Sequence, residues 1–191
     1  KQFMEDVLKY INKIKYECKK IGASILIGVP YYHGKGIGNA ALFINRNKTD
    51  FIFKSKLPNY GVFDEKRIFE PGKNIRPIKW KNLSIGVLVC EDMWNPSVPK
   101  RLTKNGIDVF ISINASPYDH NKIIERIEVA KKVTKMSGVP IVYVNQVGGQ
   151  DELVFDGSSF YMNENGKIIE KLNSWKEETR TLDIKILNND Y

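Results

Sequence analysis

The sequence LSIGVLVCEDMWNP, residues 83–96, joins a short apolar run to a cluster of reactive and polar side chains. Leu83 to Val89 is rich in branched apolar residues, which predicts a strand buried on both faces. Cys90 follows directly at the end of this strand. Catalytic groups collect at the carboxyl ends of strands in open α/β sheets, so a thiol here is a candidate nucleophile. A cysteine can equally be an inert core residue, and this stretch alone leaves both interpretations open.

The composition is that of a soluble globular protein. The chain has 191 residues, of which 42% are hydrophobic and 27% charged, which fits one domain with a substantial core. No apolar run approaches the roughly 20 residues needed to cross a bilayer, so no membrane partner is expected. The net charge is +8, but the lysines are spread along the chain rather than clustered with aromatic residues, which argues against nucleic-acid binding.

The cysteines and the first residues bear on location. Two cysteines, Cys18 and Cys90, do not indicate a disulfide scaffold and favour a reducing, cytoplasmic setting. The opening KQFMEDVLKY is amphipathic and carries acids, unlike a secretory signal. It also lacks an initiator Met and starts inside a helical pattern, so we expect a fragment of a longer protein.

Helical patterns alternate with short apolar runs along the whole chain, which predicts a mixed α/β fold. Cys18 falls on the apolar stripe of the first helix and is expected in the core. YYHGKGIG, residues 31–38, lacks phosphate-binding spacing and is expected to be a turn. Helices are predicted at residues 3–21, 97–105 and 122–137, and strands at 24–29, 40–44, 50–53, 83–89, 107–113, 139–144, 157–162, 167–170 and 181–187.

Unusual polar residues stand at the ends of several predicted strands. Cys90, Ser116 and Asn145 follow three buried strands, and Lys54 follows a fourth. Lys54 could stabilise a thiolate at Cys90 and hold the oxyanion formed when the thiolate attacks an amide. The backbone N–H of the next residue, Glu91, would be a second donor to that oxyanion.

Histidine chemistry has little support in the sequence. His33 and His120 are the only histidines, and neither flanks the candidate nucleophile in sequence. No Cys or second His is spaced to form a metal site with His33, so no metal site is predicted.

Four stretches together resemble a known family: KSKLPNYGVFDEKRIFEPG (54–72), GVLVCEDMWNP (86–96), NASPYDHNK (114–122) and VNQVGGQDELVFDGSSF (144–160). They are similar, in the same order, to the nitrilase (carbon–nitrogen hydrolase) superfamily, and within it to the glutaminase domains of glutamine-dependent NAD synthetases. The resemblance implies an α-β-β-α four-layer sandwich, here truncated at its N-terminus, with residues 1–191 forming one such domain. Subunits of the family usually pair, so a homo-oligomer is expected.

The resemblance also implies site residues. The family uses a Glu–Lys–Cys triad, in which Lys54 and Cys90 match the lysine and the nucleophile. Lys56 is the rival lysine and is expected to be exposed. Glu65 matches a second glutamate near the lysine, and its alternative role is a salt bridge to Arg67 or another neighbour. The residues that match the lining of the glutamine pocket are Tyr60, Glu91, Trp94, Ser116 and Lys122.

The activity implied is hydrolysis of the side-chain amide of glutamine through a cysteine thioester. The ammonia would pass to a synthetase domain that uses ATP and Mg²⁺ to amidate nicotinic acid adenine dinucleotide to NAD. No cofactor is expected in the glutaminase domain itself, and the SGGxDS-type pyrophosphate loop of the synthetase domain does not occur in this sequence.

One departure from the family pattern affects the expected activity. The family's general-base glutamate lies in an upstream segment that this sequence lacks, and Glu5 does not match its motif. We therefore expect the chain alone to be nearly inactive and to expose an open sheet edge. The alternatives are a stand-alone nitrilase-type amidase or carbamoylase, and a non-catalytic assembly domain.

Overall fold

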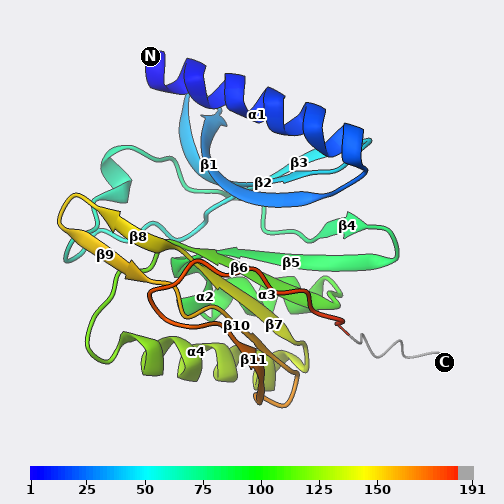
Figure 1. Ribbon diagram of the computed structural model, residues 1–191, viewed down its shortest axis with the longest axis vertical. Coiled ribbons are helices and arrows are strands. Elements are labelled where there is room, and N and C mark those ends of the chain that lie inside the picture. The colour runs from blue at the N-terminus through cyan, green and yellow to red at the C-terminus, as the bar shows by residue number, and fades with distance from the viewer. Residues whose placement is uncertain (185–191) are drawn as a thin grey trace. The chain divides into compact units, whose positions relative to one another are not determined.

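The computed structural model describes residues 1–184, and these form two compact units. The first unit runs from Lys1 to Arg76 and the second begins at Pro77. Each unit is built on its own main sheet, three-stranded in the first and six-stranded in the second (Figure 1).

The first unit packs one long helix, α1 (Gln2–Ile21), against an antiparallel sheet in the order β1-β2-β3. The apolar stripe of α1 meets the sheet in a core made by Ile11, Cys18, Leu42 and Ile44. Cys18 is therefore a core residue, as predicted. The helix ends at Gly22, whose left-handed φ of 71° suits a residue without a Cβ. The strands are β1 (Ile25–His33), β2 (Gly36–Ile44) and β3 (Thr49–Phe53).

The turn predicted within residues 31–38 exists but is much shorter than predicted, because most of this stretch is strand. The turn is confined to Gly34 and Lys35, between β1 and β2. Gly38 lies within β2, where a Cβ would approach the Phe53 ring to 2.4 Å. The Phe53 ring also stacks on His33, with 4.1 Å between ring centroids. Glycine is thus required at position 38 because an aromatic ring takes the space of a side chain.

An irregular segment, residues 54–76, completes the first unit and contains one turn of 3₁₀ helix, η1 (Glu65–Arg67). Its two ends are fastened to the sheet. The Lys54 N–H donates to the Asn39 carbonyl at 2.7 Å, and the Gly72 N–H donates to the Lys54 carbonyl at 2.7 Å. A Cβ on Gly72 would lie 2.2 Å from the Phe53 carbonyl oxygen, so only glycine allows this approach.

The second unit is organised around a six-stranded sheet in the order β11-β10-β7-β6-β5-β4. The three central strands, β5, β6 and β7, are parallel to one another, and the outer strands are antiparallel to their neighbours. The apolar run that predicted the strand before Cys90 is β5, a central strand. The bounds are β4 (Ile78–Trp80), β5 (Leu83–Val89), β6 (Val109–Asn114), β7 (Ile141–Asn145), β10 (Phe160–Met162) and β11 (Ile168–Lys171).

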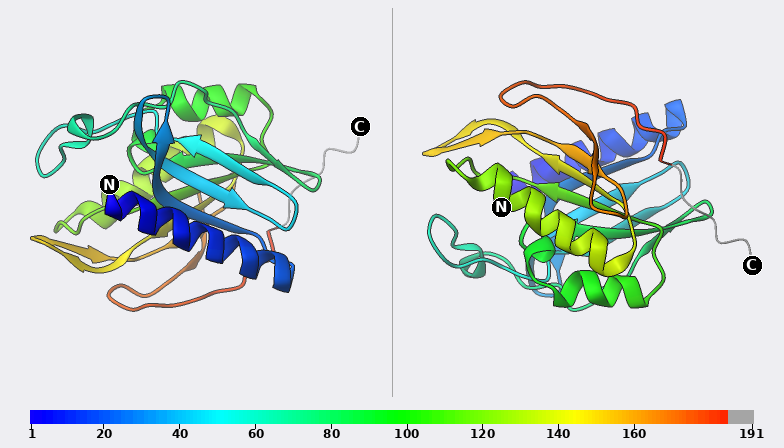
Figure 2. Two further views of the ribbon diagram at one scale, coloured as in Figure 1. Left: turned by 90° about the horizontal axis from the view of Figure 1, so that it is seen from above. Right: turned by 90° about the horizontal axis from the view of Figure 1, so that it is seen from below.

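Helices α2 (Glu91–Trp94), α3 (Ser97–Lys104) and α4 (Lys122–Ser137) cover one face of this sheet (Figures 1 and 2). Helix α4 buries Ala130, Val133 and Thr134, and the Thr134 hydroxyl lies 3.7 Å from the Met162 sulfur of β10. Gly138 ends α4 with a left-handed φ of 67°. The predicted helices at 97–105 and 122–137 are therefore confirmed.

The sequence did not predict the short elements η1, α2 and β4, or a separate hairpin of β8 (Val147–Gln150) and β9 (Leu153–Asp156). The predicted hairpin about Asn165 and Gly166 is confirmed as β10 and β11. Of the predicted tail strand, residues 181–184 are not a strand, and residues 185–187 lie outside the described residues.

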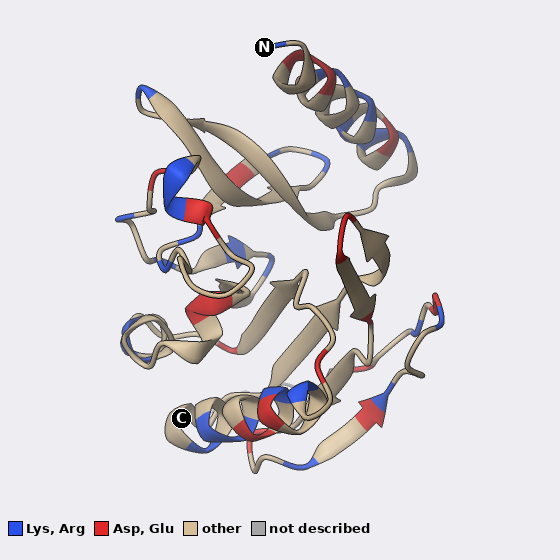
Figure 3. Cartoon of the chain, turned by 90° about the vertical axis from the view of Figure 1, so that its left-hand side faces the viewer, with Lys and Arg blue, Asp and Glu red and all other residues tan. Residues whose placement is uncertain are grey.

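Basic residues do not gather on one element. Lys and Arg occur in α1, α3 and α4 and in the connecting segments alike (Figure 3). None of the helices described between residues 1 and 184 has the length and apolar character to cross a membrane.

Candidate active site

Cys90 occupies a sharp turn between β5 and α2. Its φ of 48° and ψ of −101° lie outside the regions that side-chain-bearing residues normally adopt. The turn is held on both sides, because the Cys90 N–H donates to the Ile113 carbonyl at 3.0 Å and the Cys90 carbonyl accepts from the Met93 N–H at 3.0 Å. Such strained backbone in a non-glycine residue concentrates at active sites.

The two cysteines differ in their surroundings. Cys18 is 6% exposed and packed in the core of the first unit, whereas Cys90 is only half-buried, and neither forms a disulfide. The alternative of an inert core cysteine therefore describes Cys18 well and Cys90 poorly.

Two predicted pocket residues of the second unit contact each other. The Lys122 ammonium, at the start of α4, lies 4.5 Å from the centre of the Trp94 ring. It also pairs with Glu125 at 2.9 Å. A lysine held over an indole face is a fixed positive charge that could bind a carboxylate. Glu91, the first residue of α2, is half-buried beside Cys90 in sequence.

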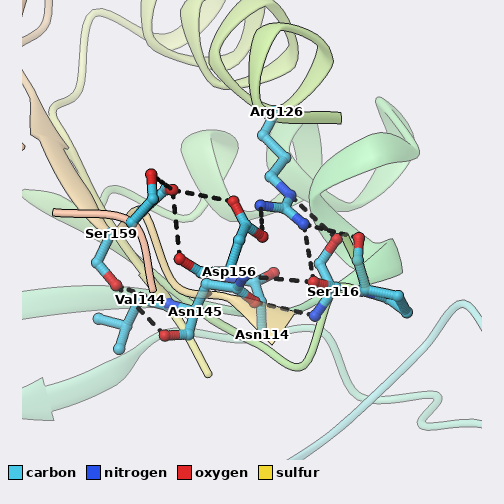
Figure 4. A network of polar contacts seen from close by, with 10 residues as sticks. Asn114, Ser116, Arg126, Val144, Asn145, Asp156 and Ser159 are labelled. Atoms are coloured by element: carbon cyan, nitrogen blue, oxygen red, sulfur yellow. Dashed lines mark hydrogen bonds and ion pairs between the residues drawn. The ribbon is translucent and has the colours of Figure 1, made fainter. Parts of the chain in front are cut away.

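Ser116, another predicted pocket residue, lies on the turn after β6 and is 4% exposed (Figure 4). The Asn145 carboxamide holds its backbone, accepting from the Ser116 N–H at 2.9 Å and donating to the Ser116 carbonyl at 3.3 Å. The Ser116 hydroxyl accepts from Arg126 Nε at 3.2 Å. Asn145 and Ser116 were both noted at predicted strand ends, and the structure brings them together.

Arg126 and Asp156 were missed in the sequence. They form an ion pair at 2.7 Å with side chains 0% and 5% exposed. A sequence signal for Arg126 existed, because it lies four residues before the buried Ala130 and so on the same stripe of α4.

Tyr143 of β7 was also missed. It is fully buried, its ring stacks on Phe160 with 4.8 Å between centroids, and its hydroxyl has the Ser116 side chain beside it but forms no hydrogen bond of normal geometry within the described part of the chain. Burial raises the pKa of Tyr143 well above its ordinary value, while the positive charge of Arg126 opposes that shift. Tyr143 therefore stays a neutral phenol.

In the first unit, Lys54 and Glu65 form an ion pair, with 2.6 Å between Lys54 Nζ and Glu65 Oε1. The Lys54 side chain is 1% exposed, and a cation so deeply buried requires a counter-charge. The other Glu65 oxygen, Oε2, is buried and has no hydrogen-bond partner within residues 1–184. The expected alternative was a salt bridge to Arg67 or another neighbour: Arg67 pairs with Asp64 at 2.6 Å instead, and the neighbour that Glu65 pairs with is Lys54.

Two further residues of the first unit were considered in the sequence, Tyr60 and Lys56. Tyr60 is largely exposed and packs edge-on against Phe63, with 5.9 Å between ring centroids. Lys56, the rival to Lys54, is half-buried rather than exposed. No group of three or more His, Cys, Asp or Glu side chains placed to hold a metal ion occurs among residues 1–184.

A nucleophile candidate on a sharp turn after a central parallel strand is an arrangement found in hydrolases, and comparison with known proteins identifies the family. The model of the carbon–nitrogen hydrolase family matches residues 8–187, and the chain belongs to this family. A carbon–nitrogen hydrolase from Helicobacter pylori, 20% identical, has the same fold with a TM-score of 0.78, covering 93% of this chain and 69% of that one. The predicted family and its mixed α/β fold are thus confirmed.

More similar relatives carry a more particular name. Glutamine-dependent NAD(+) synthetase of Thermotoga maritima is 33% identical over 189 residues, 98% of this chain and 33% of that protein. The enzyme of the same name from Acinetobacter baylyi is 44% identical over 125 residues, 65% of this chain and 23% of that protein. The solved structure of glutamine-dependent NAD+ synthetase from Acinetobacter baumannii in complex with ADP has a TM-score of 0.83 and 34% identity, covering 91% of this chain and 34% of that one. The chain thus spans a third or less of the length of these relatives.

Proposed function

We propose that this chain carries the nucleophile of a glutaminase, which hydrolyses the side-chain amide of glutamine as part of a glutamine-dependent NAD synthetase. The observation that carries the proposal is Cys90, a half-buried thiol in a strained conformation at the end of a central parallel strand. The glutamine-dependent NAD synthetases to which the chain is similar support the choice of glutamine.

The proposed reaction has two steps. The Cys90 sulfur attacks the amide carbon, the C–N bond breaks, and ammonia leaves with a proton taken from the thiol. Water then attacks the resulting glutamyl thioester, which releases glutamate and restores the thiol. Both steps pass through a tetrahedral oxyanion that needs hydrogen-bond donors.

Lys54 and the Glu91 N–H are the proposed donors to this oxyanion. Removing one such donor typically costs about 3 kcal/mol of transition-state stabilisation. Glu65 supplies the counter-charge of the buried Lys54 through their 2.6 Å contact, and its second oxygen, buried and without a hydrogen-bond partner in the described chain, can accept a proton or a hydrogen bond from the substrate. The proposal requires that Lys54 and Cys90 act on the same amide group.

The remaining predicted residues would bind the rest of the substrate. Glutamine carries an α-carboxylate, and Lys122 fixed over Trp94 offers a cation to it. Ser116 and Tyr60 would line the same substrate. We further propose that the ammonia serves a synthetase domain that uses ATP and Mg²⁺ to form NAD. Assembly as a homo-oligomer and a cytoplasmic location stay predictions.

The test is covalent labelling of Cys90 by a glutamine analogue in which a chloromethyl ketone replaces the amide. We expect one label per chain, located on Cys90 by peptide mass spectrometry. Cys90→Ser should abolish labelling, while Cys18→Ser, the matched control in the core, should keep it. L-Glutamine should slow labelling at least tenfold more than equal concentrations of L-asparagine or propionamide.

Two results would contradict the proposal. Equal protection by simple aliphatic amides would point to a stand-alone amidase. A labelling rate no faster than that of a simple thiol such as N-acetylcysteine would point to a non-catalytic domain.

A further inference from the structure

Arg126 is a cation with no exposure that directs most of its donors at a single turn of the chain (Figure 4). One terminal nitrogen donates to the carbonyls of Ser116 and Pro117, both at 2.8 Å, and Nε donates to the Ser116 hydroxyl at 3.2 Å. The other terminal nitrogen donates to Asp156 at 2.7 Å. Three of these four contacts therefore fix the position of residues 116–117.

The counter-ion is itself held in place. Asp156 accepts from Arg126 with one oxygen and from the Ser158 hydroxyl with the other, at 2.9 Å. Ser158 in turn lies 2.7 Å from the Ser174 hydroxyl. A buried ion pair is weak support for stability alone, because apolar residues of similar volume often stabilise a fold as well. The Arg126–Asp156 pair is better explained by its hydrogen bonds to residues 116–117, which it holds in position.

The turn that Arg126 holds begins beside the nucleophile. The Cys90 N–H donates to the Ile113 carbonyl at 3.0 Å, and Ser116 follows Ile113 by three residues. The buried Tyr143 lies near the same groups, because the pKa of its hydroxyl, raised mainly by burial, is also shifted by the charges of Arg126, Cys90 and Asp156. Cys90 and the buried ion pair therefore share one polar region of the second unit.

The contact from Arg126 also determines whether the Ser116 hydroxyl acts as a donor or an acceptor. Arg126 Nε–H occupies a lone pair of the Ser116 oxygen, since a guanidinium can only donate. The proton of Ser116 is left to donate to an acceptor, for which the neighbouring Tyr143 hydroxyl and a bound substrate are the candidates. An arginine in this arrangement keeps Ser116 in one orientation and in one role.

We propose that Arg126, with Asp156 as its counter-ion, is a positioning residue that fixes the Ser116–Pro117 turn and presents the Ser116 hydroxyl as a donor to the substrate held at Cys90. This inference rests on the proposed function and deepens it. Arg126 does not touch the substrate and acts through Ser116.

The experiment compares two labelling rates at Cys90 in the same chain. One reagent is the chloromethyl ketone analogue of glutamine, and the other is methyl methanethiosulfonate, which reports only whether the thiol is accessible and reactive. The ratio of the two rates measures recognition of the glutamine moiety. The variants are Arg126→Lys, which keeps the charge and loses the planar fork, and the double variant Arg126→Met/Asp156→Leu, which replaces the pair by apolar volume. Arg101→Lys, on the exposed side of α3, is the matched control.

We expect the ratio to fall at least tenfold in both Arg126 variants and to stay within twofold in the control. Thermal unfolding, followed in parallel, should show the double variant folded. A folded double variant, or Arg126→Lys alone if the double variant does not fold, with an unchanged ratio would overturn the inference and leave the proposed function standing. A wild-type chain that shows no preference for the glutamine analogue would overturn the proposed function, and this inference with it.

Discussion

The two units each contain one buried ion pair, and the two pairs differ in how completely they are satisfied. In the second unit, both oxygens of Asp156 and all three nitrogens of Arg126 have hydrogen-bond partners. In the first unit, Lys54 pairs with one oxygen of Glu65, and the other oxygen is buried without a partner among the described residues. A closed network holds a shape, whereas an open one keeps an acceptor available for chemistry.

The two ion pairs also differ in how deeply their side chains are buried. Arg126 and Asp156 are 0% and 5% exposed, while Glu65 is 17% exposed beside a lysine that is 1% exposed. The Glu65 side chain therefore reaches the surface in part, although its unpaired oxygen is buried, whereas Asp156 is enclosed. Two ion pairs of almost equal length, 2.6 and 2.7 Å, are thus suited to different tasks.

The largest expected effect is a loss of stability when the Arg126–Asp156 ion pair is broken. Arg126→Met leaves the Asp156 carboxylate buried and unpaired, which typically costs about 3–5 kcal/mol of unfolding free energy. The three tryptophans, Trp80, Trp94 and Trp175, all lie in the second unit, so denaturant unfolding followed by tryptophan fluorescence reports on that unit. Arg101→Met, at an exposed site, should cost less than 0.5 kcal/mol, as is usual for surface changes. A loss below about 1 kcal/mol for Arg126→Met would show that Asp156 does not depend on the pair.

Breaking the Lys54–Glu65 ion pair should change the reactivity of Cys90 more than the stability of the protein. Glu65→Gln keeps an acceptor for Lys54 but removes the negative charge that positions the lysine, so labelling of Cys90 by the glutamine analogue should slow about 100-fold, the size of a lost oxyanion donor. Asp64→Asn, which alters the neighbouring exposed pair with Arg67, is the control and should change the rate less than twofold. Equal slowing in the two variants would mean that Glu65 has no special role.

The smallest effect is expected at a third ion pair, between Asp50 and Arg76, which is more exposed than the other two. Burial alone would raise the pKa of Asp50, but Arg76 and Lys48 outweigh it and hold the pKa below the ordinary value. A carboxyl whose pKa is lowered by folding stabilises the protein above its unfolded pKa of about 3.9, and this contribution is lost as the pH falls through the folded pKa.

Arg76 is 38% exposed, so solvent screening limits its contribution. Arg76→Met should cost no more than about 1 kcal/mol at pH 7. That cost should shrink towards zero as the pH is lowered through and below the folded pKa of Asp50. Amide hydrogen exchange in β2 and β3, measured at pH 7 and pH 3 with Lys79→Met as the surface control, checks this. A cost that stays constant between the two pH values would contradict the role of Asp50.

Periodic apolar residues made the main elements predictable from the sequence. Helix α1, strand β5 and helix α4 follow simple patterns, and the structure has them close to the predicted bounds. The β8 strand, VGGQ, was missed because two glycines interrupt any alternation of apolar residues. Residues 31–38 were misjudged for a related reason, since Gly38 marks close packing against Phe53 rather than a turn.

The candidate site was predictable only in part. Cys90 and Lys54 stand in sequence motifs, so they could be predicted as site residues, whereas Arg126 stands among many lysines and its burial depends on long-range contacts. Its partner Asp156 is 30 residues away, and no local pattern links the two. The strained backbone at Cys90 is also a tertiary property, because it depends on the hydrogen bond to Ile113 of the neighbouring strand.

The fastening of the 54–72 segment has an evolutionary consequence. Because the Gly72 N–H binds the Lys54 carbonyl, both ends of the segment are fixed at one point on the sheet. Exposed residues near its middle, such as Tyr60 and Val62, can vary in size or number without pulling on Lys54. A loop closed at its base in this way lets the residues at its middle change among descendants while the lysine stays in register with the strand that carries it. Gly72 is then the residue that such divergence must preserve, since any side chain there would strike the backbone of Phe53.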